Sequence, residues 1–211
     1  MPSTTEQTSA GALPTVLGVV RRVQVQRMPL KPGPRGARVY DPSPLLPVPR
    51  VRVTPDGVVG LAPSGPVVDV HHAAHPLTRH RRRLNGLSVL PAAHYDQLRA
   101  TFGAHLVDGC AGENLLLETD GAWTGEEVEG EVQLHLETEE GPPLRIDAVT
   151  AASPCVEFAR WALGRGVGPV DDEVRAALAV LADGRRGYYL STSDRGTVAP
   201  GARLLRRPSS S

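Results

Sequence analysis

Cysteine and lysine are scarce in this chain of 211 residues. Only Cys110 and Cys155 are present, so a four-cysteine zinc site is excluded and a disulfide framework is not expected. Of the 23 basic residues, only Lys31 is a lysine. It lies in the proline-rich segment 29–34, a poor place for a desolvated amine. We therefore expect that this chain does not bind pyridoxal phosphate covalently.

Net charge, long apolar runs and several common motifs are also missing. The chain has 23 basic and 23 acidic residues, so no overall field attracts nucleic acid or an anionic membrane. No apolar run is long enough to cross a bilayer. Residues 1–12 lack the basic start and apolar stretch of a secretory signal, so we expect a cytoplasmic protein. A Walker-type loop, a dinucleotide glycine fingerprint and a Gly-x-Ser-x-Gly elbow are absent, which argues against the common nucleotide-binding and hydrolase classes.

Short runs rich in valine and leucine alternate with glycine and proline breaks, and this spacing predicts many short strands. The expected strands cover residues 15–25, 38–40, 50–54, 58–61, 86–90, 114–118, 131–137, 144–150, 187–191 and 202–205. Segments 91–102, 153–164 and 171–184 have helical spacing instead. Strands that mostly follow one another through turns predict a mainly β fold, a largely antiparallel barrel with about three peripheral helices.

Cys155 is the most informative single residue. Ser153 is a suitable N-cap and Pro154 suits the first helical position, which would place Cys155 in the first turn of a helix. There the helix dipole would make the thiol ionise more easily than that of a free cysteine. Such a thiolate can attack, carry sulfur or bind a soft metal, and the alternative is a small buried apolar side chain. Cys110 lies in a turn without this feature, and we interpret it as packing.

Histidines and arginines cluster near the middle of the chain. His71 and His75 are four residues apart, the spacing of two zinc ligands on a helix, but Pro76 disfavours a helix and no third ligand is apparent. The arginines, among them Arg79 and Arg81, form either a solvated loop or a pocket for phosphate, which guanidinium groups bind bidentately.

Two further segments are candidates for the border of a cleft. A glycine turn precedes Glu113 and Asn114, which open a predicted strand and are expected to point into the cleft. Arg185 and Arg186 lie between glycines just after a predicted helix. They are candidates for anion binding, and the alternative is capping of the helix C-terminus.

Taken together, these segments resemble the MOSC domain, named for the C-terminal part of molybdenum cofactor sulfurases. The match runs in order over most of the chain. It is carried by Asp69-Val-His-His72, Asn85-Gly-Leu-Ser-Val-Leu-Pro-Ala-Ala-His-Tyr95, Asp108-Gly-Cys-Ala-Gly-Glu-Asn-Leu115, Ser153-Pro-Cys155, Asp183-Gly-Arg-Arg-Gly-Tyr188 and residues 196–202.

The resemblance implies a single MOSC-type, β-barrel-like domain at residues 14–206, with an N-terminal strand extension at 15–61. Residues 1–13 and 207–211 are expected to be flexible tails. It also implies an association with the molybdenum-pterin cofactor. In molybdenum-containing relatives, the cysteine at the position of Cys155 ligates the metal and the enzyme reduces N-hydroxylated compounds. The chain lacks an iron–sulfur or flavin motif, so an electron-donor protein would be needed.

Cys155 is therefore our candidate catalytic residue and molybdenum ligand in a molybdenum cofactor-dependent oxidoreductase that acts on a small-molecule substrate. The candidate cofactor-binding residues are His71, His72, Arg79, Arg81, Asn85, Glu113, Asn114, Arg185 and Arg186. The nearest alternative is a sulfur transferase, in which Cys155 carries persulfide sulfur supplied by a separate pyridoxal-dependent cysteine desulfurase. A non-catalytic cofactor-delivery module is a further alternative. Neither nucleic acid nor a membrane is an expected partner.

Overall fold

The computed structural model describes residues 13–79, 86–128 and 133–207. Its main feature is a nine-stranded sheet, in which eight strands follow the order β10-β11-β6-β7-β1-β13-β8-β9 and β2 pairs with β1. These strands are β1 (Thr15–Gln26), β2 (Leu45–Val48), β6 (Leu87–Pro91), β7 (Leu115–Glu118), β8 (Gln133–Leu136), β9 (Leu144–Ile146), β10 (Ala148–Ala151), β11 (Tyr188–Ser191) and β13 (Arg203–Arg207). The mainly β prediction is confirmed.

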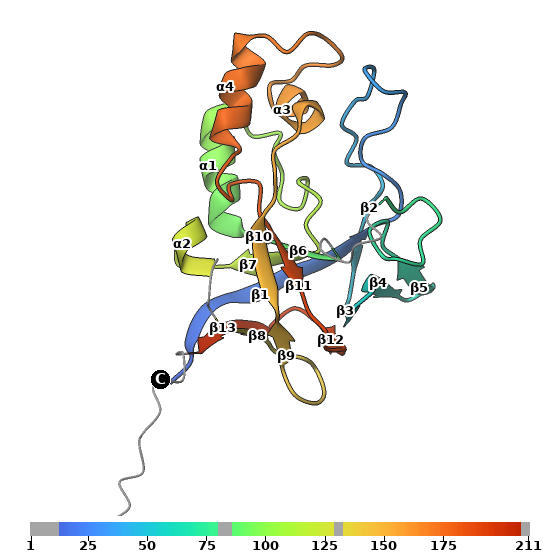
Figure 1. The fold of residues 1–211 in the computed structure, drawn as a ribbon, viewed down its shortest axis with the longest axis vertical. Coiled ribbons are helices and arrows are strands. Elements are labelled where there is room, and N and C mark those ends of the chain that lie inside the picture. The colour runs from blue at the N-terminus through green and yellow to red at the C-terminus, as the bar shows by residue number, and fades with distance from the viewer. Residues whose placement is uncertain (1–12, 80–85, 129–132, 208–211) are drawn as a thin grey trace, which may run out of the picture.

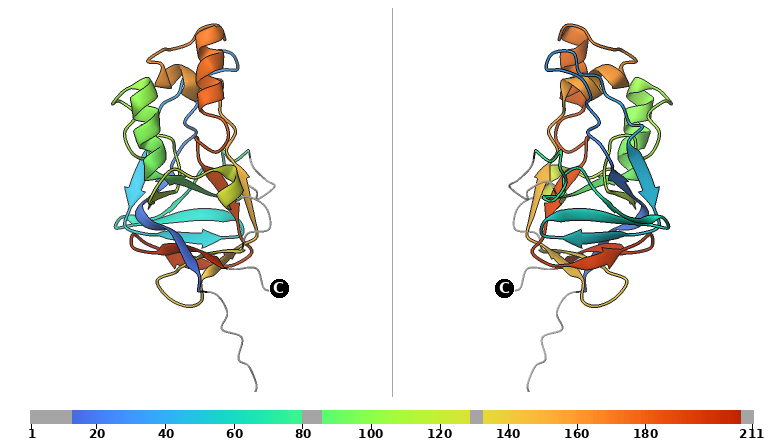
Figure 2. Two further views of the ribbon diagram at one scale, coloured as in Figure 1. Left: turned by 90° about the vertical axis from the view of Figure 1, so that its left-hand side faces the viewer. Right: turned by 90° about the vertical axis from the view of Figure 1, so that its right-hand side faces the viewer.

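The sheet curls into a nearly closed barrel (Figures 1 and 2). Strands β9 and β10 stand at opposite ends of the strand order, yet only Asp147 separates them in the chain. The backbone N–H of Asp147 donates to Ser191 O over 2.8 Å, and Thr192 Oγ1 donates to Arg145 O over 2.6 Å. The two ends of the sheet are thus joined by continuous chain rather than left as distant edges.

A second sheet has four strands in the order β12-β3-β4-β5. They are β3 (Val51–Thr54), β4 (Gly57–Ala62), β5 (Gly65–Val68) and β12 (Gly196–Val198). All strand pairs of both sheets are antiparallel except β6 with β7, whose connection contains helix α1 (Ala92–Phe102). A parallel pair needs such a crossover, and it places the loop after α1 at the start of β7.

Three more helices are present in the described parts of the chain: α2 (Gly125–Val128), α3 (Val156–Ala162) and α4 (Asp172–Val180). Helices α1, α3 and α4 lie at one end of the barrel (Figures 1 and 2). The three predicted helices are found. Helix α4 begins with an acidic cap, because Asp171 accepts a hydrogen bond from Val174 N over 3.0 Å. The short α2 was not predicted.

Two clusters of buried apolar side chains hold these parts together. One comes from both sheets and includes Val25, Val53 and Leu115, each with at most 1% of its surface exposed. The other packs the helices onto the barrel and includes Leu90 and Phe158, which are fully buried. No helix in the described ranges is both long and apolar enough to cross a membrane.

Candidate active site

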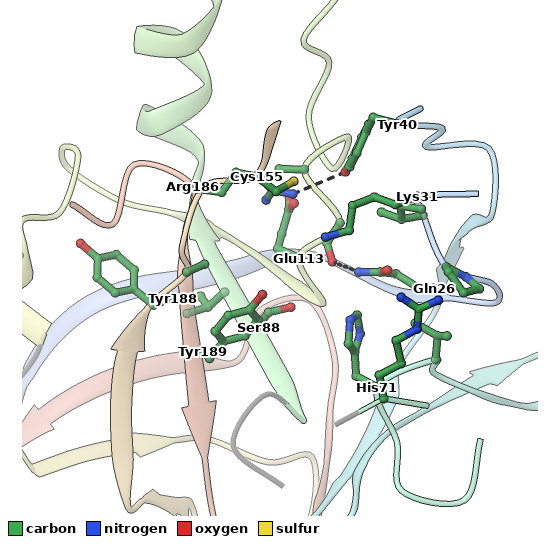
Figure 3. Close-up of a pocket in the computed structure, with 18 of the residues that line it drawn as sticks. Gln26, Lys31, Tyr40, His71, Ser88, Glu113, Cys155, Arg186, Tyr188 and Tyr189 are labelled. Carbon is green, nitrogen blue, oxygen red and sulfur yellow. Dashed lines mark hydrogen bonds between the residues drawn. The ribbon is translucent and has the colours of Figure 1, made fainter. Parts of the chain in front are cut away.

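A pocket of about 350 Å³ opens where the helical end meets the barrel (Figure 3). Its volume falls within the range of small-molecule sites. Segments far apart in the sequence line it: the end of β1, the loop after β5, strand β6, the loop before β7, the start of α3 and the segment that enters β11. Four cationic side chains contribute to the wall: Lys31, Arg38, Arg79 and Arg186. The pocket therefore suits an anionic ligand.

The structure brings together about half of the residues that the sequence suggested. The pocket lining includes His71, Arg79, Glu113, Cys155 and Arg186. Three other candidates, His72, Asn114 and Arg185, belong to the same segments but do not line it. The remaining two candidates, Arg81 and Asn85, lie outside the described residues.

Cys155 lines the pocket and is partly exposed. It was expected in the first helical turn with Ser153 as the N-cap, but the helix begins two residues later and this prediction was wrong. Cys155 itself is the N-cap of α3, with extended backbone angles, and its carbonyl accepts the first helical hydrogen bond from Ala159 N over 3.0 Å. Its side chain makes no capping hydrogen bond. The thiol is thus left facing the pocket rather than used to close the helix.

Arg186 is fixed by aromatic side chains. Its guanidinium carbon lies 4.1 Å from the ring centroid of Phe158, and its Nη2 atom is 3.5 Å from Tyr40 Oη. Burial lowers the pKa of Arg186, but the nearby Tyr40 and Cys155 oppose this effect and the net shift is upward. Cation–π stacking on Phe158 leaves the planar fork of N–H donors available to a ligand.

Arg185 points elsewhere. Its side chain is exposed, and Nη1 donates to Val180 O, the last residue of α4, over 3.2 Å. The helix-capping alternative therefore describes its contact in the structure. Adjacent arginines in one glycine-flanked turn have different environments.

The turn before β7 depends on two glycines with left-handed backbone, Gly109 at φ 90° and Gly112 at φ 87°. Two glutamines on β1 hold it. Gln24 Nε2 donates to Gly109 O and Glu113 O, each over 2.8 Å, and Gln26 Nε2 donates to Gly112 O over 2.7 Å. A β-carbon at Gly112 would lie 2.8 Å from Gln26 Nε2, so the absence of a side chain at Gly112 lets the turn approach β1 closely.

Glu113 is a buried acid on the pocket wall. Only 3% of its surface is exposed, and Tyr95 Oη donates to its two oxygens over 2.9 and 3.1 Å. Burial raises its pKa to about 7, although the hydrogen bond from Tyr95 and the charge of Arg186 act in the opposite direction. Glu113 therefore exchanges a proton near neutral pH.

Asn114 is buried and bonds to the framework. Its Oδ1 accepts from Ser88 N over 3.1 Å and from Ser88 Oγ over 3.0 Å, and its Nδ2 donates to Asp69 Oδ2 over 3.0 Å. Asp69 in turn holds His71 at the pocket. The expectation that Asn114 points into the cleft was wrong, because these partners use its amide group.

Cys110 is buried, as expected for packing, and burial raises the pKa of its thiol to about 12. His72 and His75 accept hydrogen bonds within their own turns, from Ala74 N and Leu77 N, each over 3.1 Å. Across the described residues, no group of three histidine, cysteine or acidic side chains is arranged to hold a metal ion.

Several lining residues were missed by sequence reasoning: Gln26, Lys31, Arg38, Tyr40, Ser88 and Tyr189. Gln26 had a usable signal, because Gln24 and Gln26 alternate with valines at the end of β1, and both glutamines are buried. Lys31 was noticed as the single lysine, but only its proline-rich setting was weighed. Arg38 and Tyr40 had no distinguishing signal.

The MOSC domain family model matches residues 76–204. Among solved structures, the chain is similar to the YUAD protein from Bacillus subtilis, with a TM-score of 0.55 and 9% identity, covering 93% of this chain and 100% of that one. A second structure, described as a hypothetical protein, gives a TM-score of 0.53 and 18% identity, covering 90% of this chain and 69% of that one. A third structure, YiiM from Escherichia coli, gives a TM-score of 0.49 and 18% identity, covering 79% of this chain and 66% of that one.

No curated protein matches the chain. At these identities the structural similarities show the fold alone. The family model, however, covers more than half of the sequence. On that ground the chain belongs to the MOSC domain family, which is generally associated with the molybdenum cofactor.

Proposed function

We propose that the pocket binds a molybdenum-pterin cofactor, with Cys155 as the protein ligand to the metal, and that the protein reduces N-hydroxylated small molecules or transfers an oxygen atom. The observation that carries the proposal is one juxtaposition: the partly exposed thiol of Cys155 shares a pocket with four cationic side chains. A soft ligand beside a site for anions suits a metal held by a phosphate-bearing organic group.

The residues present fit such a group. Within the described residues, Nε of Arg38 is buried and has no hydrogen-bond partner, although this side chain borders the pocket. Buried polar atoms are rarely left unpaired, and a bound phosphate would satisfy this one. Lys31, Arg79 and Arg186 supply the remaining positive charge. Since no three-residue metal cluster exists in the described parts of the chain, most ligands of the metal would come from the cofactor and solvent.

When bound, the cofactor would supply oxygen-atom and electron exchange, which amino-acid side chains lack. The side chains of this pocket then have definable roles. Cys155 would donate charge to the metal, Arg186 would orient the anionic part of the cofactor, and Glu113, with its pKa raised to about 7, would exchange a proton. Electrons come from a separate donor protein. A thiol ligand must stay reduced, so the proposal places the protein in the cytoplasm.

Metal analysis tests the assignment. The chain is produced in a host that makes the cofactor, and molybdenum per protein is measured for wild type, Cys155→Ala and Cys110→Ala. We expect Cys155→Ala to lose about tenfold or more of the metal, because loss of even an outer-shell partner costs that much affinity. Cys110→Ala is the matched control, because Cys110 is buried away from the pocket lining. Unchanged molybdenum in Cys155→Ala would defeat the ligand assignment.

A persulfide carrier is the second candidate, and the partial exposure of Cys155 favours it. A separate pyridoxal-dependent cysteine desulfurase would pass its outer sulfur atom to Cys155. Mass spectrometry after incubation with a desulfurase and free cysteine tests this. A mass increase of one sulfur on wild type that Cys155→Ala lacks supports the carrier, and no added sulfur counts against it. Pterin retention without turnover would instead favour a delivery module.

A further inference from the structure

Asp69 and His71 form a hydrogen-bonded pair at the pocket. The side chain of Asp69 is fully buried, with 0% of its surface exposed, and that of His71 is 23% exposed. Asp69 Oδ1 accepts from His71 N over 2.9 Å and lies 3.0 Å from His71 Nδ1. Asp69 Oδ2 accepts from Gln26 N over 2.7 Å and from Asn114 Nδ2 over 3.0 Å. Four donors from three segments therefore fix this carboxylate.

The pair sets the tautomer of His71. A carboxylate offers only acceptors, so the short contact to Nδ1 requires His71 to donate from that atom. In the neutral ring the lone pair then resides on Nε2. When Nε2 gains a proton, the resulting positive charge is stabilised by Asp69 on the other side of the ring. The geometry thus prepares Nε2 for proton exchange.

His71 lies across the pocket from Cys155 and Arg186, and Glu113 lies between them (Figure 3). A ligand held at Cys155 would therefore present its far side to His71. Among the described residues, the other charged or titratable groups that line this space are Lys31, Arg38, Tyr40, Arg79, Glu113, Cys155, Arg186, Tyr188 and Tyr189. Asp69 is the acid in contact with the imidazole ring.

We propose that His71 is the proton donor of this site and that Asp69 is its positioning residue. The inference rests on the proposed function. Reduction of an amidoxime consumes two electrons and two protons: the N–O bond breaks, an amidine forms and the oxygen leaves as water. The electrons come from an external reductant. One proton passes from Nε2 of the His71 imidazolium to the departing oxygen, and the second reaches the amidine nitrogen from solvent. The ring returns to its neutral form, with Nδ1–H still donating to Asp69.

The tautomer is tested without any cofactor. Long-range proton–nitrogen correlation spectra of protein with nitrogen-15-labelled histidine distinguish Nδ1–H from Nε2–H rings, and loss of a signal in His71→Gln assigns it. We expect the Nδ1–H form in wild type and a shift toward Nε2–H in Asp69→Asn. If Asp69→Asn does not fold, the wild-type spectrum by itself still shows which ring nitrogen of His71 carries the proton. An Nε2–H ring in folded wild type overturns the pairing.

The proton-donor role is tested with benzamidoxime and reduced methyl viologen on the cofactor-loaded protein. General acid catalysis contributes about 100-fold or more, so we expect His71→Gln to lower kcat by about that factor with little change in KM. The kcat of wild type is measured across pH, and a step in that profile that belongs to His71 should be absent from the profile of His71→Gln. Glu113 also titrates near neutral pH, so the step belongs to His71 only if this variant removes it.

His75→Gln is the matched control, because His75 lies in the same turn region but does not line the pocket. We expect its kcat and pH profile to equal those of wild type. If wild type is active and His71→Gln keeps the same pH profile, the proton-donor role of His71 is overturned but the proposed reductase function is not. A cofactor-loaded wild type without activity would overturn the proposed reductase function and the proton-donor role with it, whatever the tautomer.

Discussion

Replacing Glu113 with glutamine tests whether the pocket wall holds a carboxyl that is neutral at mildly acidic pH. Glu113 is buried, and burial raises its pKa from 4.5 to about 7. Tyr95 donates to the carboxyl, and a glutamine amide oxygen of the same shape accepts the same bond. The substitution therefore removes one ionisation and leaves the packing nearly unchanged.

The sign of the effect follows from proton binding. Because the folded-state pKa lies above that of the unfolded chain, the folded protein holds one proton more between pH 4.5 and about 7. The free energy of unfolding of wild type should then fall as pH rises, by about 1.4 kcal/mol per pH unit within that window. Between pH 4.5 and about 7, the total decrease in the free energy of unfolding approaches about 3 kcal/mol. Glu113→Gln has no ionisable group at this position, so its free energy of unfolding should lack this pH-dependent decrease.

Urea unfolding at several pH values between about 5 and 8 measures the difference directly. We expect Glu113→Gln to gain stability relative to wild type across this range, with most of the gain complete just above neutral pH. Glu118→Gln is the control, because Glu118 ends the following strand and is exposed. A difference between wild type and Glu113→Gln that stays constant from acidic to alkaline pH would refute the reasoning, since the buried carboxyl would then stay ionised among the pocket cations.

Two further predictions concern the glycine turn and the adjacent arginines. Gly112→Ala should lower the free energy of unfolding by about 1–3 kcal/mol, because φ is +87° and the new β-carbon would approach Gln26 Nε2 within 2.8 Å. Gly141→Ala is the control, because Gly141 has a similar φ of +86° but open space around it, so its substitution carries only the backbone cost of a positive φ. Equal melting temperatures for the two variants would contradict the steric argument. Arg186→Lys should weaken binding of inorganic phosphate about tenfold in calorimetric titrations, whereas Arg185→Lys should change it little. Equal losses in both variants would show that the pocket does not distinguish the two arginines.

The fold could be predicted to the extent that its elements carry local signals. Several barrel strands are short runs rich in valine and leucine, such as β6 and β7, and α4 begins with an acidic cap. The strands β2, β5 and β12 were missed, and β2 and β5 contain Pro47 and Pro66. Proline is confined to sheet edges, and β5 is indeed an edge strand. The segment 38–40 was predicted as a strand, but Val39 N donates to Pro32 O within a long loop.

The candidate site was predictable in its chemistry but not in its contacts. Cys155, His71 and Arg186 carry reactive or charged groups, and the order of motifs singled them out. Which of two adjacent arginines enters the pocket depends on a ring of α3, Phe158, that no local pattern connects to it. The position of Arg38 in the pocket wall could not be predicted from local sequence either, because tertiary packing brings its loop to the pocket.

The pocket geometry is set by a buried polar junction between the two sheets. Asp69 directly follows β5 of the small sheet, yet its carboxylate accepts from Gln26 N on β1 and from Asn114 Nδ2 at the start of β7. A buried carboxylate is costly unless donors surround it, so the segments that carry these donors are held at a fixed separation. His71 takes its ring orientation from the same carboxylate. A substitution at Asn114, which does not line the pocket, would therefore act on His71 through Asp69, by geometry rather than by loss of a ligand contact.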